Sequence, residues 1–142
     1  MREGKLTYQE YRGKVVLKVY GKGTWLEGKT FLNFCEKKFR EGKEIYIDLQ
    51  DCQNIDSTFL GIIASFVLKH QKLYLFHVKS PHILRSIKTL GLDKIFSPLG
   101  KEMEPEFPKE VKEWEISPQA ISSKEVKEIV AQLKRKELNQ FL

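Results

Sequence analysis

The stretch EIYIDLQDCQNIDSTFLGIIASFVLKH, residues 44–70, decides the fold because a strand, a polar loop and a helix follow one another within it. The nearly continuous apolar run at 44–49 is typical of a strand that is covered on both faces. The apolar run at 59–68 is too long for an ordinary strand and too short to cross a membrane. Since a further apolar strand is expected at 72–78, we predict that a buried helix connects two parallel strands.

The residues before this stretch predict a hairpin and a first helix. Segments 5–11 and 14–23 are strand-like, and the short Arg-Gly connection between them indicates a tight turn. An apolar stripe that begins near Lys29 then predicts a helix, which we expect to end at Gly42.

A third helix is expected at 80–91, because both of its ends are marked. Ser80 is a suitable N-cap, Pro81 fits the first helical position, and Gly91 fits the left-handed position after the last turn. The residues expected on its buried face are Ile83, Leu84, Ile87 and Leu90.

Length favours one domain, which we place at residues 1–100. Residues 101–142 begin with a connection rich in proline and charge and end in a helix opened by Ser122 and Glu125, a capping box. We expect this helix to pack on the same domain or on the partner in a homodimer.

Composition and charge exclude several classes of protein. The formal net charge is +6, but the basic residues are scattered and form no stripe with interleaved aromatic residues, so we expect no direct nucleic-acid binding. The N-terminus has no apolar signal segment and no run is long enough for membrane insertion, which predicts a cytoplasmic protein. Cys35 and Cys52 match no metal or redox motif and are expected to be free thiols.

Catalytic chemistry finds little support in the residues. The three histidines have no metal-ligand spacing, and Ser57 does not stand in the Gly-x-Ser-x-Gly turn of hydrolases. Asp48, Asp51 and Asp56 suggest a hydrated magnesium ion, but carboxylates are common in such loops and at helix caps. We therefore expect no catalytic residue, no metal and no cofactor.

The position of Ser57 is its distinguishing property. It lies where the polar loop becomes a helix, so its hydroxyl group is expected to reach solvent beside the positive end of the helix. The alternative is that Asp56 or Ser57 only caps this helix.

The sequence resembles the STAS domain family, in particular the small bacterial anti-sigma-factor antagonists. The resemblance rests on IYIDLQDCQNIDSTFLG at 45–61 and continues through KLYLFHV to LGLDKIF, so that it covers about residues 5–98. It implies an α/β fold with a mixed, mostly parallel sheet flanked by helices, to which this chain adds a C-terminal helix.

The resemblance also assigns roles to individual residues. Ser57 matches the serine that a partner kinase phosphorylates, and Thr58 is a secondary candidate. Asp56 precedes this serine as in the family, and Asp48 matches the carboxylate that closes the preceding strand. Phe59 stands where many members have glycine, and we expect it to reshape the partner surface. These five residues form the expected partner-binding set.

The function implied by the resemblance is a non-enzymatic binding module. The unmodified protein would bind an anti-sigma factor that is a serine kinase, phosphorylation of Ser57 would break the complex, and a serine phosphatase would restore it. The phosphate would add about −1.5 to −2 charge beside Asp56. The alternative is a non-enzymatic STAS scaffold subunit of a larger signalling or lipid-transport assembly. A small metal-dependent enzyme that uses Asp48 and Asp56 is the third class.

Overall fold

Strands β1 (Gly4–Tyr11) and β2 (Lys14–Gly23) form the antiparallel hairpin that the sequence predicts. The computed structural model of the chain describes residues 4–70, 73–96 and 104–117. Arg12 and Gly13 make the turn with φ angles of 48° and 79°, in the left-handed region that two-residue hairpin turns require.

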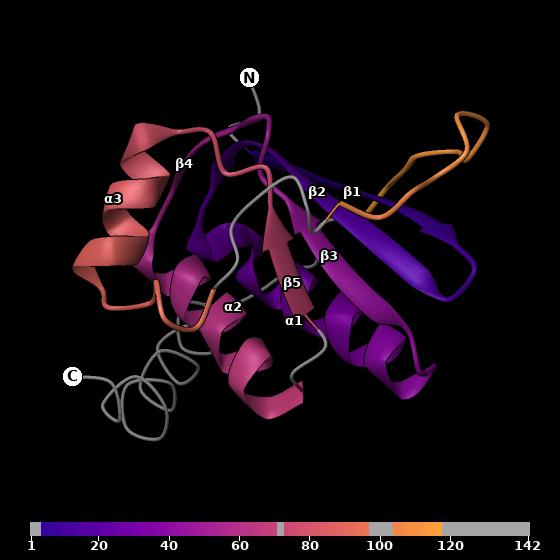
Figure 1. The fold of residues 1–142 in the computed structure, drawn as a ribbon, viewed down its shortest axis with the longest axis horizontal. Helices are drawn as coiled ribbons and strands as arrows, with labels where there is room; N and C mark the ends of the chain where they lie inside the picture. The colour runs from indigo at the N-terminus through magenta and orange to yellow at the C-terminus, as the bar shows by residue number, and fades with distance from the viewer. Residues whose placement is uncertain (1–3, 71–72, 97–103, 118–142) are drawn as a thin grey trace.

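The sheet is mixed, as predicted, with strand order β5-β3-β2-β1-β6 (Figure 1). Strand β3 (Glu44–Asp48) lies parallel to both β2 and β5 (Leu73–Phe76). A short strand that the sequence did not reveal, β4 (Cys52–Ile55), pairs in parallel with the end of β2. It carries the chain from β3 to the start of the next helix.

Helices α1 (Trp25–Arg40) and α2 (Ser57–His70) lie side by side below the sheet in the view of Figure 1. The expected start of the first helix near Lys29 was wrong, because Thr24 and Glu27 form a capping box that starts α1 four residues earlier. The helices approach closely at Gly28, where an added Cβ would lie 2.8 Å from Ile62 Cδ1. The connection of β3 and β5 through α2 confirms the predicted crossover.

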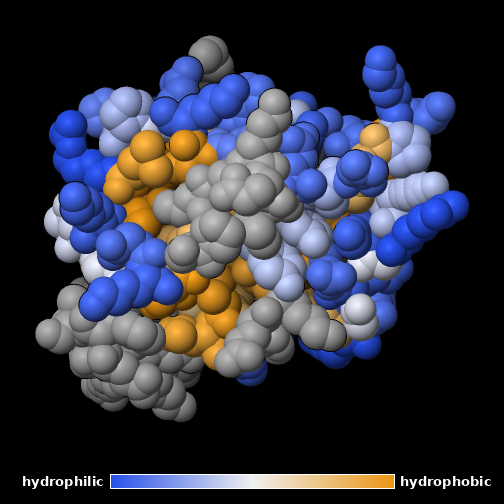
Figure 2. All heavy atoms as spheres, in the orientation of Figure 1, coloured by the Kyte–Doolittle hydropathy of each residue, from blue (hydrophilic) through white to orange (hydrophobic). Residues whose placement is uncertain are grey.

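Helix α3 (Pro81–Thr89) has the predicted signals at both ends. Ser80 Oγ accepts a hydrogen bond from the backbone nitrogen of Ile83, and Gly91 has a φ of 72°. One expectation for its buried face was wrong: Leu84 is 41% exposed, because it lies on the outer side of the helix. Figure 2 shows hydrophobic side chains between α2 and α3, whereas the surface over the β1–β2 hairpin is hydrophilic.

The two faces of the sheet bury different sets of side chains. On the face that α1 and α2 cover, apolar residues from every long strand join the helices in one core. On the opposite face, Val16, Tyr46 and Phe76 form a smaller cluster, against which Tyr74 and Phe107 pack. Alternation along β3 therefore directs Ile47 toward the helices and Asp48 toward the smaller cluster.

The segment 104–117 contains a strand that the sequence did not predict, β6 (Trp114–Glu115), which pairs with β1. The expected C-terminal helix at 122–142 lies outside the described residues. Within the described parts of the chain, none of the helices has the length and hydrophobicity needed to cross a membrane.

Candidate functional site: the junction of two helix N-termini

The Asp56 carboxylate binds the first turns of two helices at once. Its Oδ1 accepts a hydrogen bond from the backbone nitrogen of Phe59, and its Oδ2 accepts one from the backbone nitrogen of Trp25, both at 2.8 Å. The backbone nitrogen of Asp56 also donates to the carbonyl oxygen of Gly23 at 2.9 Å. Asp56 is therefore the N-cap of α2 and ties that helix to the start of α1.

Ser57 and Thr58 are the first two residues of α2. The side chain of Ser57 is exposed, and Thr58 is half-buried. Backbone N–H groups in the first turn of a helix lack partners within the helix and carry partial positive charge. Ser57 therefore presents a hydroxyl group to solvent at a position where an added anion would be favoured electrostatically.

Sequence reasoning missed the contribution of α1 to this junction. Trp25 is 38% exposed and Leu26 is 52% exposed, and both lie in the first turn of α1, next to the turn that holds Ser57. The spacing of Thr24 and Glu27 was the available signal, because a capping box marks the start of a helix and so places Trp25 and Leu26 in its first turn.

The expectation that Phe59 forms part of a partner surface needs correction. Its side chain has no exposed area, and its ring packs against Phe31 with the centroids 5.1 Å apart. The third position of α2 faces α1 and the core. Phe59 therefore holds the start of the helix in position and cannot touch a partner directly.

Asp48 also does not join the junction. It lies at the end of β3, and its side chain points to the face of the sheet opposite α1 and α2. There it lines a cavity together with His77 and Glu104. The backbone nitrogen of Gln50 donates to Asp48 Oδ1 at 2.9 Å. Burial raises the pKa of Asp48, although the Gln50 hydrogen bond and nearby His77 and Lys18 act in the opposite direction. The structure therefore brings Asp56, Ser57 and Thr58 together and separates Asp48 from them.

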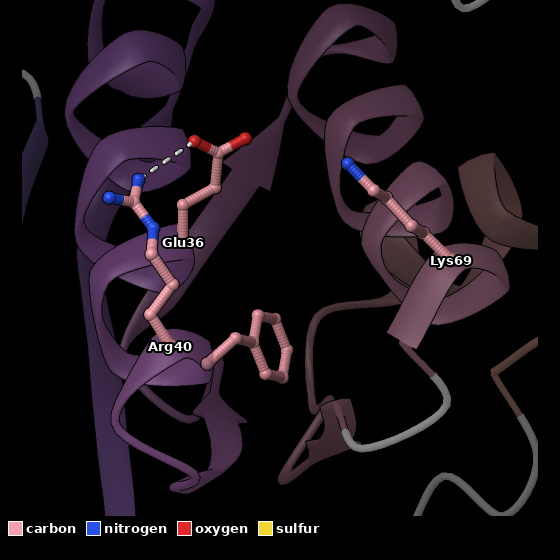
Figure 3. Close-up of a pocket in the computed structure, with 4 residues that line it drawn as sticks. Glu36, Arg40 and Lys69 are labelled. Atoms are coloured by element: carbon pink, nitrogen blue, oxygen red, sulfur yellow. Dashed lines mark ion pairs between the residues drawn. The ribbon is translucent and has the colours of Figure 1, made fainter.

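A shallow hollow of about 340 Å³ lies between the C-terminal ends of α1 and α2 (Figure 3). It is lined by Glu36, Phe39, Arg40 and Lys69. Arg40 Nη2 pairs with Glu36 Oε2 at 3.6 Å, and Arg40 is largely exposed. Solvent-exposed ion pairs of this kind contribute little to the free energy of unfolding.

Both cysteines are free thiols, as predicted, and both are buried. Burial raises the pKa of both thiols, which keeps them protonated and unreactive. Within residues 4–70, 73–96 and 104–117, no group of three or more His, Cys, Asp or Glu side chains is arranged to hold a metal ion.

A crystal structure of an anti-sigma factor antagonist from Mycobacterium paratuberculosis has a similar fold. The superposition gives a TM-score of 0.59 with 22% sequence identity and covers 69% of this chain and 86% of that chain. The fold is STAS-like. No protein-family model matches the sequence, and no curated protein is significantly similar to it. The similarity thus confirms the expected fold class.

Proposed function

We propose that the protein is a phosphorylation-controlled binding module that acts as an anti-sigma-factor antagonist in the cytoplasm. Its partner is an anti-sigma factor with serine kinase activity, which it binds when unphosphorylated. The kinase phosphorylates Ser57, or secondarily Thr58, and a serine phosphatase reverses the modification. The protein itself carries out no reaction.

The observation that carries this proposal is an exposed serine at a junction held in place from two sides. Asp56 binds backbone N–H groups of both α1 and α2, and Phe59 anchors the same turn in the core. A hydroxyl group on such a turn is accessible to a kinase, while the turn keeps its shape for recognition by a partner.

A phosphate on Ser57 would change charge without requiring the domain to refold. It would add about −1.5 to −2 charge next to Asp56, whose two oxygens already accept backbone hydrogen bonds. The first-turn N–H groups of α2 can partly stabilise the phosphate. A partner surface that fits the neutral serine would then meet a dianion, which is sufficient to break a complex.

The exposed apolar side chains of α1 supply the second part of the proposed contact surface. Trp25 and Leu26 adjoin the Ser57 turn, and large apolar or aromatic side chains at the centre of an interface contribute most of its binding energy. A partner that covers them would also cover Ser57, so association and phosphorylation would be coupled.

The test is recovery of complexes from the source cell with tagged protein, followed by native mass spectrometry. Unmodified protein and Ser57→Ala should recover a serine kinase of the anti-sigma type, and Ser57→Asp should not. An Asp at the first helical position is favourable for the helix, so loss of the partner would not reflect unfolding. Incubation with the recovered kinase and ATP should place phosphate on Ser57.

Ser117→Asp is the matched control, because it adds the same charge at another exposed serine and should leave the complex intact. Equal recovery of the kinase with Ser57→Asp, or absence of phosphate from both Ser57 and Thr58, would contradict the proposal. Recovery of stoichiometric assembly subunits without a sigma regulator would favour the scaffold alternative.

A further inference from the structure

A separate cavity of about 180 Å³ opens on the face of the sheet opposite α1 and α2. It lies at the carboxyl ends of the parallel strands β3 and β5, which is where open α/β sheets commonly bind ligands. Its apolar wall is made by Val16, Phe76 and Phe107. None of the residues of the Ser57 junction lines it.

Two carboxylates and one imidazole converge on this cavity. His77 Nδ1 lies 3.4 Å from Asp48 Oδ1, and His77 Nε2 lies 3.1 Å from Glu104 Oε2. The Asp48 side chain is only 10% exposed. His77 Nδ1 is buried and, despite the short distance to Asp48, makes no hydrogen bond of acceptable geometry. Its backbone has a φ of 55°, which is unusual for a residue other than glycine.

The side chains at the cavity carry more negative than positive charge. His77 can supply at most one charge, and only when it is protonated. Lys18 also lines the cavity, but its ammonium pairs with Glu113 Oε1 at 3.5 Å. Buried carboxylates in proteins are normally paired with a cation. Asp48 is buried and Glu104 adds a second negative charge at the rim, so the cavity favours a positively charged ligand.

The arrangement favours an organic cation over a metal ion. The two carboxylates face opposite nitrogens of the His77 ring. The ligands of a metal ion surround a single point, and this arrangement does not. The wall of Phe76 and Phe107 instead suits a short carbon chain, and aromatic faces attract an ammonium group.

We propose that this cavity binds a small free amine in its protonated form, with the ammonium group at the Asp48 carboxylate and the carbon chain against Val16, Phe76 and Phe107. The negative charge of Glu104 at the rim adds to the attraction without a direct contact. The volume of about 180 Å³ corresponds to about six water molecules. It therefore accommodates an alkylammonium of a few carbons, whereas the backbone of a lysine-containing peptide would have to remain outside it.

The test is a nuclear magnetic resonance titration of the protein with n-butylammonium, n-butanol and butyrate, which are similar in size and differ in charge. Butylammonium should shift the backbone amide signal of Gln50 and the ring signals of His77 saturably, because Gln50 donates to Asp48. Butanol and butyrate should not. Acetyl-Gly-Lys-Gly-amide should bind more weakly than butylammonium.

Asp48→Asn should weaken butylammonium binding about tenfold or more, Glu104→Gln should weaken it by a smaller factor, and the exposed control Asp93→Asn should leave it unchanged. Glu104 lies at the rim, with 43% of its side chain exposed, so its replacement does not threaten folding. Equal shifts with butanol, unweakened binding in both carboxylate variants, or tighter binding of the lysine peptide would overturn the proposal. These outcomes are independent of kinase recovery and of Ser57.

Discussion

Asp56 Oδ2 accepts a hydrogen bond from the backbone nitrogen of Trp25 at 2.8 Å, although 31 residues separate the two in sequence. The same carboxylate caps α2 through Phe59. One side chain therefore sets the relative position of two helix N-termini. The turn that presents Ser57 and the turn that presents Trp25 and Leu26 form one surface because of this shared carboxylate.

Replacement of Asp56 should destabilise the fold in proportion to the number of acceptors lost. Asp56→Ala removes both hydrogen bonds and should lower the free energy of unfolding by about 1–3 kcal/mol. Asp56→Asn keeps one oxygen acceptor and should lose about half as much. Urea denaturation measures both, with Asp51→Ala, an exposed carboxylate, as the control. Equal stability of the Asn and Ala variants would show that only one of the two hydrogen bonds matters.

Phe59 should behave as a core residue and not as a contact residue. Phe59→Ala leaves a cavity against Phe31 and should cost about 3–5 kcal/mol in urea denaturation. Leu26→Ala, at an exposed position, should change stability by no more than about 0.5 kcal/mol and should weaken partner recovery. A loss below about 1 kcal/mol for Phe59→Ala would mean that the helix N-terminus can collapse around the gap.

The sequence predicted those elements whose ends carry local signals. Ser80, Pro81 and Gly91 fix α3 because each satisfies or relieves a backbone group at a helix end, whatever the rest of the chain does. The β1–β2 hairpin has the same local origin. Strand β4 was missed because Gln53 and Asn54 are exposed, so its pattern of two buried ends and a polar middle resembles a loop.

Features that depend on contacts between distant segments were not predicted. The family pattern placed Asp48 with the Ser57 site, but the pleat directs its side chain to the opposite face of the sheet. There it meets His77, whose other ring nitrogen contacts Glu104 from the segment 104–117. Similarly, the bond from Trp25 to Asp56 depends on the packing of α1 beside α2, which no local pattern specifies.

Neutralising Asp48 should stabilise the protein at neutral pH. Burial raises the pKa of Asp48 above its ordinary value of 3.8, so the folded state disfavours the ionised form. Asp48→Asn keeps an oxygen that can accept from Gln50 and should raise the free energy of unfolding by about 0.5–2 kcal/mol, the usual range of a single stabilising substitution. The gain should be fully present above the raised pKa and should disappear as the pH falls below 3.8, where the folded and unfolded states both bind the proton.

Urea denaturation at several pH values measures this difference, with Asp93→Asn as the exposed control. A gain that stays constant down to acid pH would show that the charge of Asp48 is not its cause.

Glu113 should control the titration of Tyr20. Burial, and then the hydrogen bond from the Tyr20 hydroxyl group to Glu113 Oε2 at 2.6 Å, raise the pKa of Tyr20 from 10.0 to about 12. The resulting stabilisation is present below pH 10.0 and is lost as the pH rises to about 12, because the unfolded chain ionises first. Glu113→Gln removes the charge and leaves the burial.

The pKa of Tyr20 in Glu113→Gln should therefore fall but stay above 10.0. Ultraviolet absorbance of tyrosinate measures it, and the difference from Tyr20→Phe assigns the signal among the five tyrosines. Glu113 also accepts from Thr7 Oγ1 at 2.6 Å and thus links the segment that carries β6 to both strands of the hairpin. An unchanged pKa in Glu113→Gln would mean that burial, and not the charge of Glu113, raises the pKa of Tyr20.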